Sequence, residues 1–148
     1  RSDIMDLYAP GSMTSTHSAS PLAVAAAIES LNIIEKEKLV EQSAKLGEIL
    51  NAELAKIQKK HSSFLGCHHG KGLVAGIQVV KPGTKTPDPE VAQKINVACY
   101  QKGLLMFAPV GIAGECVKIC PPLCISEEML RESLEVFRQA VDEVAASL

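Results

Sequence analysis

The chain has 148 residues, which is enough for one ordinary domain or for a small domain with part of another. Its composition, 47% hydrophobic and 22% charged, is typical of a globular protein with a core of its own. A net charge of −2, two Tyr, three Phe and no Trp argue against a basic or aromatic-rich surface for nucleic acid and against a basic surface for membranes.

The first 60 residues are predicted to hold a loop and two helices. Residues 1–20 are mostly polar and are expected to be loop. Ser20 is a good N-cap and Pro21 suits a first helical turn, so a helix should begin there and run to about Glu35. This helix is apolar nearly all round and therefore needs protein on several sides. A second helix should reach about Lys60, and Gly47 within it indicates a close contact.

From residue 70 onward the pattern favours short strands mixed with helices. A continuous β-prone run predicts a strand over 73–80, and two shorter strands are expected at 104–108 and 116–120. Asp88 should cap a helix that stops at Gly103, and Ser126 should cap the last helix. The order β-α-β-β-α predicts an α+β layer, with helices on one face of a small sheet. The first strand pair could be parallel, because a helix separates its members, and the pair around 109–115 resembles a hairpin.

The loop before the first long helix is rich in hydroxyl groups. Residues 14–20 combine Ser and Thr side chains with a single histidine, His17. Free hydroxyls and backbone N–H groups at a helix start can hold an anion, typically a phosphate. The alternative is an ordinary capped helix after a polar loop.

Three segments together resemble one enzyme family. Residues 16–23, Thr-His-Ser-Ala-Ser-Pro-Leu-Ala, resemble the Thr-(aromatic or His)-Gly-Gly-Asn-Pro-Leu-Ala segment of the class III aminotransferases. Gly-Lys-Gly-Leu at 70–73 and Val-Lys-Ile-Cys-Pro-Pro-Leu at 117–123 follow in the family's order. The resemblance covers nearly the whole chain but only the C-terminal part of the family's longer sequence. It implies the end of the large domain and linking helices at 1–60, and the small α+β domain of a fold-type-I enzyme at 61–148.

The resemblance also implies two binding residues. Members of this family use pyridoxal 5′-phosphate, and the threonine matching Thr16 reaches across the dimer to the phosphate of the neighbouring subunit's cofactor. Lys118 stands where the family usually has the arginine that grips the substrate carboxylate; a lysine keeps the charge but lacks the planar fork. The alternatives are an ordinary loop threonine and a solvated strand lysine. His17 is given no catalytic role, and His69 is interpreted as structural.

No catalytic residue is predicted in this chain. The family's Schiff-base lysine lies upstream of the threonine segment, and no lysine here has a matching context, since Lys71 belongs to the Gly-Lys-Gly turn. Pyridoxal chemistry needs that lysine, so the parent protein is expected to be an enzyme and this chain alone inactive. The chain begins at Arg1 and not at Met, which favours a processed, cleaved or truncated product.

The resemblance therefore predicts the C-terminal fragment of an aminotransferase that exchanges an amino group between an amino acid or amine and a keto acid. As its partners we expect those small molecules and, in the full-length enzyme, a second copy of the chain. A decarboxylase or lyase on the same scaffold stays open, and so does a non-catalytic α+β module that binds or dimerises. The apolar helix from Pro21 separates these readings, because it would leave a sticky surface on a stand-alone module.

The spacing of the cysteines indicates whether the chain could bind a metal, and the absence of long apolar runs indicates its cellular location. A zinc site is suggested by Cys67-His68-His69 and the later cysteines, but no Cys-x-x-Cys pair occurs and Pro121-Pro122 interrupts any helix that could present the sulfurs together. We therefore predict no metal and mostly buried, reduced thiols at Cys67, Cys99, Cys116, Cys120 and Cys124. With no membrane-length run and no secretory segment in the sequence, a cytoplasmic protein is expected.

Overall fold

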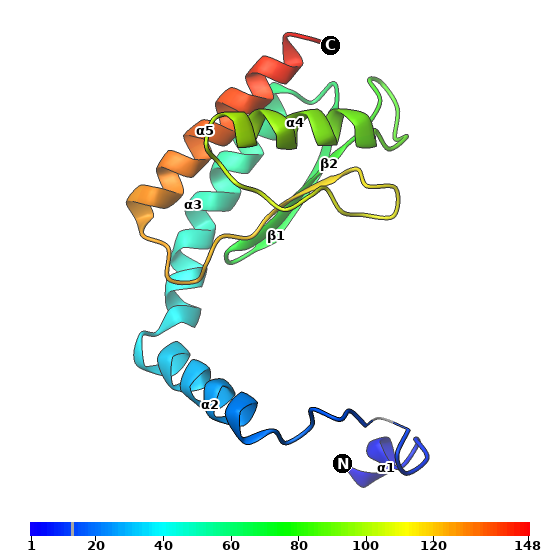
Figure 1. The fold of residues 1–148 in the computed structure, drawn as a ribbon. Coiled ribbons are helices and arrows are strands. Elements are labelled where there is room, and N and C mark those ends of the chain that lie inside the picture. The colour runs from blue at the N-terminus through cyan, green and yellow to red at the C-terminus, as the bar shows by residue number, and fades with distance from the viewer. Residues whose placement is uncertain (13) are drawn as a thin grey trace. The chain divides into compact units, whose positions relative to one another are not determined.

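The computed structural model describes residues 1–12 and 14–148 and divides into two compact units, Arg1–Glu37 and Lys38–Leu148 (Figure 1). Residue 13, part of the predicted loop, lies outside the described residues. None of the helices among the described residues is both long enough and apolar enough to cross a membrane.

The first unit holds a short helix, a loop and one long helix. Helix α1 (Ser2–Met5) interrupts the predicted loop, and α2 (Pro21–Lys36) matches the predicted helix within one residue. Ser20 is its N-cap, as predicted, but the Ser20 hydroxyl makes no capping hydrogen bond. None of the sixteen residues of α2 is buried, and the exposed apolar side chains are those of Leu22, Val24, Ile28, Leu31 and Ile33. The apolar surface predicted for this helix is therefore uncovered.

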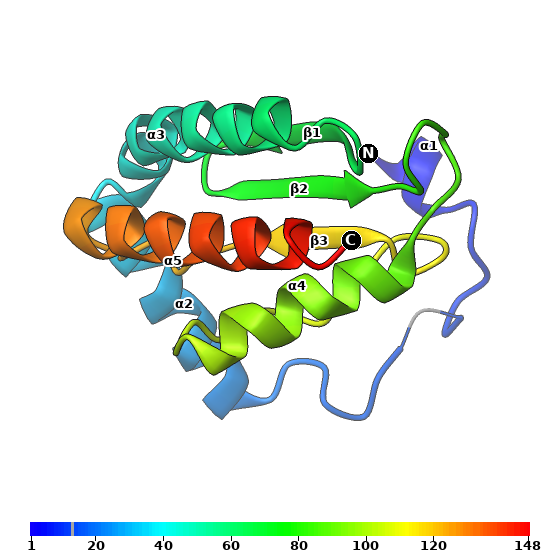
Figure 2. The same ribbon diagram turned by 90° about the horizontal axis from the view of Figure 1, so that it is seen from above.

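The second unit is a three-stranded antiparallel sheet with helices packed on it. Its elements are α3 (Leu39–Lys60), β1 (Leu65–Lys71), β2 (Val74–Val79), α4 (Pro89–Gln101), β3 (Cys116–Ile119) and α5 (Glu127–Ala145). The strand order is β1-β2-β3. Helices α3 and α4 pack against the sheet and α5 packs against both, so that the three lie on one side of it (Figure 2). The predicted α+β architecture, a small sheet covered by helices, is confirmed.

The core lies between the sheet and these helices. Along β2, Ala75, Ile77 and Val79 are buried, whereas Val74 and Gln78 are exposed, as expected for a strand with one face toward a core. The predicted caps also form: Asp88 accepts a hydrogen bond from Val91 N and Ser126 from Met129 N. The largest fully buried side chains are Leu50, Leu54, Leu65, Leu73, Ile77, Ile95 and Leu130.

The sheet differs from the prediction in three ways. Strand β1 was not predicted, because Cys, two His and Gly dominate its sequence. Residues 104–108 are not a strand. The backbone pairing in this region is an isolated bridge between Val110, just after them, and Cys116 at the start of β3. The parallel pairing considered for strands 73–80 and 104–108 is wrong, since residues 104–108 form no strand and β2 pairs with both β1 and β3 in the antiparallel direction. Between α4 and β3 the chain passes through the segment 104–110 and reverses at the loop that follows. Strand β3 then runs antiparallel to β2.

The β1–β2 hairpin is fastened to α3 by the Gly-Lys-Gly segment. Gly72 has φ +55°, and a Cβ at Gly47 would lie 2.5 Å from the carbonyl carbon and oxygen of Gly72. Ser43 Oγ accepts a hydrogen bond of 3.1 Å from Leu73 N, and Asn51 Nδ2 donates to Gly72 O at 3.4 Å. The close contact that Gly47 indicated is therefore confirmed, and it sets the position of the sheet on α3. Because α3 belongs to the second unit, the division at 37/38 differs from the domain boundary expected between 60 and 61, which stays a prediction about the whole protein.

Candidate functional site

Lys118 lies on the central part of β3, on the face of the sheet opposite the helices. Its neighbour Val117 is buried in the core, and side chains alternate along a strand, so Lys118 points the other way. The residue directly across from it on β2 is Gly76. Gly76 also pairs with His69 on β1, so these three residues form one row across the sheet. The glycine leaves the half-buried Lys118 without a bulky cross-strand neighbour, although Cys116 Sγ lies close by.

The Lys118 ammonium has an aromatic neighbour and no acidic one. Its Nζ lies 4.9 Å from the centroid of the Phe107 ring, within the range of a cation–π interaction. Among the ion pairs formed by residues 1–12 and 14–148, none involves Lys118. Glu115, the nearest carboxylate along the chain, is buried and accepts a hydrogen bond of 3.0 Å from Ala113 N. A half-buried ammonium without a carboxylate partner can bind an anionic group from a ligand.

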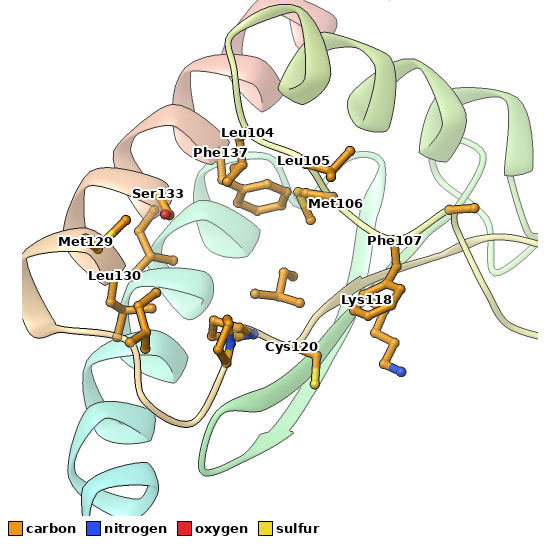
Figure 3. A pocket seen from close by; sticks show the side chains of 16 residues that line it. Leu104, Leu105, Met106, Phe107, Lys118, Cys120, Met129, Leu130, Ser133 and Phe137 are labelled. Carbon is orange, nitrogen blue, oxygen red and sulfur yellow. The ribbon is translucent and has the colours of Figure 1, made fainter.

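An apolar cavity of about 650 Å³ lies beside this lysine. Its walls come from residues 104–108, from the end of β3 with the two prolines that follow, and from α5. Of the described residues that line it, Lys118 alone is charged. Figure 3 shows Phe107 and Lys118 together at one end of the cavity, with the ammonium pointing away from the apolar lining. The size is that of a small-molecule site.

Thr16 lies in an exposed turn at the start of the first unit's long helix. The turn is held by Ser18 N, which donates to Ser15 O at 3.0 Å, and by His17 N, which donates to Ser15 Oγ at 3.2 Å. Ala19 has φ +57°, an uncommon value for a residue other than glycine. Thr16 and Lys118 belong to different units, and the structure describes each in its own unit.

The cysteines do not form a metal site in this structure. All five are free, and within the described residues no group of three or more His, Cys, Asp or Glu side chains could hold a metal ion. The prediction that most are buried is wrong: only Cys99 is buried, and burial raises the pKa of its thiol to about 11. Burial and the nearby Glu115 and Cys67 also raise the pKa of Cys116. Neither Cys99 nor Cys116 is therefore activated as a nucleophile by a lowered pKa.

Sequence reasoning missed Phe107, although the hairpin it predicted contained the signal. Continuing the register of the bridge between Val110 and Cys116 places Ala108 level with Lys118, so the ring of the preceding residue, Phe107, comes within reach of the lysine. The register could be guessed from the loop 109–115, but the pairing of an aromatic ring with the lysine required the coordinates.

The comparisons with known proteins identify the family. A family model described as aminotransferase class-III matches residues 1–141. The chain belongs to the class III aminotransferases. The resemblance of the three sequence segments to this family is thereby confirmed.

Curated relatives and solved structures of class III proteins match most of the chain. The 5-aminovalerate aminotransferase of Pseudomonas aeruginosa is 35% identical over 146 residues, which are 98% of this chain and 34% of the relative. The alanine/serine racemase of Pyrococcus horikoshii is 34% identical over 143 residues, 97% of this chain and 29% of the relative. The crystal structure of acetylornithine aminotransferase from Elizabethkingia anophelis superposes with a TM-score of 0.78 at 31% identity, covering 97% of this chain and 34% of that one. The chain thus spans about a third of the length of these proteins, and the predicted fold class is confirmed.

Proposed function

We propose that this chain is the C-terminal part of a pyridoxal-phosphate-dependent enzyme that transfers an amino group between an amino acid or amine and a keto acid. The family supports this proposal, and so do the names of relatives such as the 5-aminovalerate aminotransferase. In the proposed enzyme Lys118 binds the acidic group of the substrate and Thr16 binds the cofactor phosphate. The lysine that carries the cofactor and the pocket for its ring belong to the rest of the protein, so the chain alone is inactive.

The observation that carries the proposal is the environment of Lys118. Its charge is half-buried, has no carboxylate partner in the described part of the chain and borders a small-molecule cavity. A lysine that merely decorated the surface would more often be solvated on all sides. A ligand carboxylate can reach this ammonium on the face of the sheet opposite the helices, where the residue across from Lys118 is Gly76.

The residues around Thr16 fit the phosphate end of the cofactor. The Ser20 hydroxyl is not used as a cap, α2 has no acidic residue in its first turn, and Thr16 is exposed nearby. A helix N-terminus favours an anion, and a hydroxyl that donates to a phosphate forms a charge-assisted hydrogen bond. When bound, pyridoxal phosphate would supply an electron sink for the carbon that carries the amino group. Thr16, Ser20 and the backbone at the start of α2 would hold and orient its phosphate.

A homodimer in the cytoplasm is part of the same proposal. The family resemblance implies that Thr16 serves the cofactor of a second subunit. The uncovered apolar side chains of α2 are of the kind that an interface buries. Five free cysteines suit a reducing compartment.

The test is steady-state kinetics of the full-length enzyme on a panel of amino donors. Lys118→Ala should lower kcat/KM for donors that carry an acidic group, and the decrease should correspond to a loss of about 2–4 kcal/mol in transition-state binding, because a charged partner is lost. Lys118→Arg keeps the charge and alters the geometry, so it should change the preference among acidic donors. The control is Lys81→Ala, which removes an exposed turn lysine and should change nothing. Unchanged kcat/KM on every donor in Lys118→Ala would show that Lys118 is an ordinary surface lysine.

A racemase is the second candidate. The alanine/serine racemase among the relatives is as similar to this chain as the aminotransferases are. A racemase would return its amino acid with the opposite configuration and without net transfer of the amino group. Chiral analysis of the recovered donor separates the two activities.

A further inference from the structure

We propose that Phe107 is the residue that positions Lys118, so that the lysine can recognise an acid without the planar fork of an arginine. This inference rests on the proposed role of Lys118 in substrate binding. It assigns Phe107 a positioning role and no contact with the reacting atoms.

The segment that carries Phe107 is anchored to the core. Leu104 and Met106 are partly buried and pack against the core, whereas Leu105 and Phe107 are 83% and 56% exposed. The alternation shows that an extended backbone holds every second side chain inward. Phe107 therefore stands on a fixed base and projects its ring outward beside β3.

The ring meets Lys118, which is the one charged side chain among the described residues that line the cavity. The Lys118 Nζ lies 4.9 Å from the ring centroid, and Figure 3 shows the two side chains next to each other. A ring face attracts an ammonium through its quadrupole and takes no proton from it. The N–H groups that point away from the ring stay available to a carboxylate.

Positioning matters more for lysine than for arginine at such a site. Lysine has a flexible four-carbon stem and offers a point charge, whereas the guanidinium is planar and preorganised for two parallel hydrogen bonds. The Phe107 ring removes part of that freedom before the ligand arrives, which lowers the entropy lost on binding. No described carboxylate does this for Lys118, since Glu115 is bound to Ala113 N.

The experiment replaces Phe107 in the full-length enzyme and measures kcat/KM for a donor with an acidic group and for an amine without one. Phe107→Leu should lower kcat/KM for the acidic donor about two- to five-fold, the value of a cation–π contact at an exposed site. Phe107→Tyr should restore the wild-type value and Phe107→Trp should equal or exceed it, since Trp is the best ring for a cation. The amine should be unaffected. Tyr100→Leu makes the same type of change at a 69% exposed ring on α4 and should be silent.

A double-mutant cycle with Lys118→Met separates the two proposals. If Phe107 acts through Lys118, then Phe107→Leu should have no further effect in the Lys118→Met background. If Lys118→Met alone leaves acidic donors unaffected, the proposed role of Lys118 fails, and the positioning role fails with it. If Lys118→Met has its effect but Phe107→Leu is silent, or is equally harmful without the lysine, only the positioning role is overturned. A series in which Leu equals Tyr and Trp would overturn it as well.

Discussion

At the scale of single residues, the proposed function rests on Lys118 and Thr16, each of which is proposed to bind an anionic group. Lys118 differs from the arginine that the family resemblance implies at its position, and the structure pairs it with the Phe107 ring and not with a carboxylate. Thr16 lies in an exposed turn ahead of α2, where a hydroxyl can donate to a phosphate. We propose that Lys118 binds the acidic group of the substrate and that Thr16 binds the phosphate of the neighbouring subunit's cofactor.

Thr16→Val in the full-length dimer should weaken cofactor binding while leaving the fold intact. A hydrogen bond to a charged group contributes roughly 1.5–3 kcal/mol, so the dissociation constant of pyridoxal phosphate should rise about 10- to 150-fold. Equilibrium dialysis against the cofactor measures it, with circular dichroism as the check on folding. Thr14→Val removes a neighbouring exposed hydroxyl and is the matched control. Cofactor held as tightly by the Thr16 variant as by the wild type would mean that Thr16 is only a loop residue.

Sequence reasoning predicted binding roles for these two residues, which stay predictions, and did not include Phe107. Thr16 and Lys118 stand inside short motifs, so their positions could be predicted without coordinates. The role of Phe107 depends on which residue of an irregular segment lies beside Lys118, and Leu105 and Phe107 are equivalent in a pattern of alternating exposure. Local sequence does not determine such a pairing; the position of the segment against β3 does.

At the scale of elements, the contact between α3 and the β1–β2 hairpin determines where the sheet lies. The hairpin backbone touches α3 at Gly47, and Gly72 has the positive φ that the turn requires. Because β3 pairs with β2, the position of Lys118 on β3 depends on the contact between Gly47 and the turn at Gly72.

Gly47→Ala should destabilise the protein although alanine is the better helix former. The new Cβ would meet backbone atoms of Gly72, which cannot rotate away as a side chain could. Overpacking costs about 1–3 kcal/mol, and a clash with rigid backbone belongs to the upper part of that range, above the gain of about 1 kcal/mol in helix propensity. Urea unfolding of the full-length protein would measure the loss. The exposed neighbour Glu48 provides the control, since Glu48→Ala should stay within about 0.5 kcal/mol of wild type. A Gly47→Ala protein as stable as Glu48→Ala would contradict the close packing.

Helices α2 to α5 and strands β2 and β3 were predictable from the sequence, whereas β1 and the extended segment 104–108 were not. Capping residues and apolar periodicity placed α2 to α5 closely, because those signals are local. Strand β1 has a weakly β-prone sequence and exists because β2 offers it a partner. Residues 104–108 are the reverse case. They are apolar and extended but form no strand, and the pairing that follows them is an isolated bridge between Val110 and Cys116.

At the scale of the whole molecule, the chain is about a third of a class III protein. Its second unit has a core of its own, whereas α2 in the first unit leaves its apolar side chains exposed. The assignment of 1–60 to the large domain and linking helices, and of 61–148 to the small domain, stays a prediction about the complete enzyme. The composition argues against a nucleic-acid surface, whereas the reaction stays a proposal because the chain spans about a third of the length of its relatives.

The most direct test of the proposed aminotransferase activity is the amount of keto acid released by the full-length enzyme in a single turnover. The enzyme, loaded with pyridoxal phosphate, is mixed with an amino acid donor in the absence of any keto acid acceptor. An aminotransferase retains the amino group and should release close to one equivalent of the corresponding keto acid per subunit, with no carbon dioxide. Release of carbon dioxide, or recovery of the donor with inverted configuration and without keto acid, would contradict the proposal.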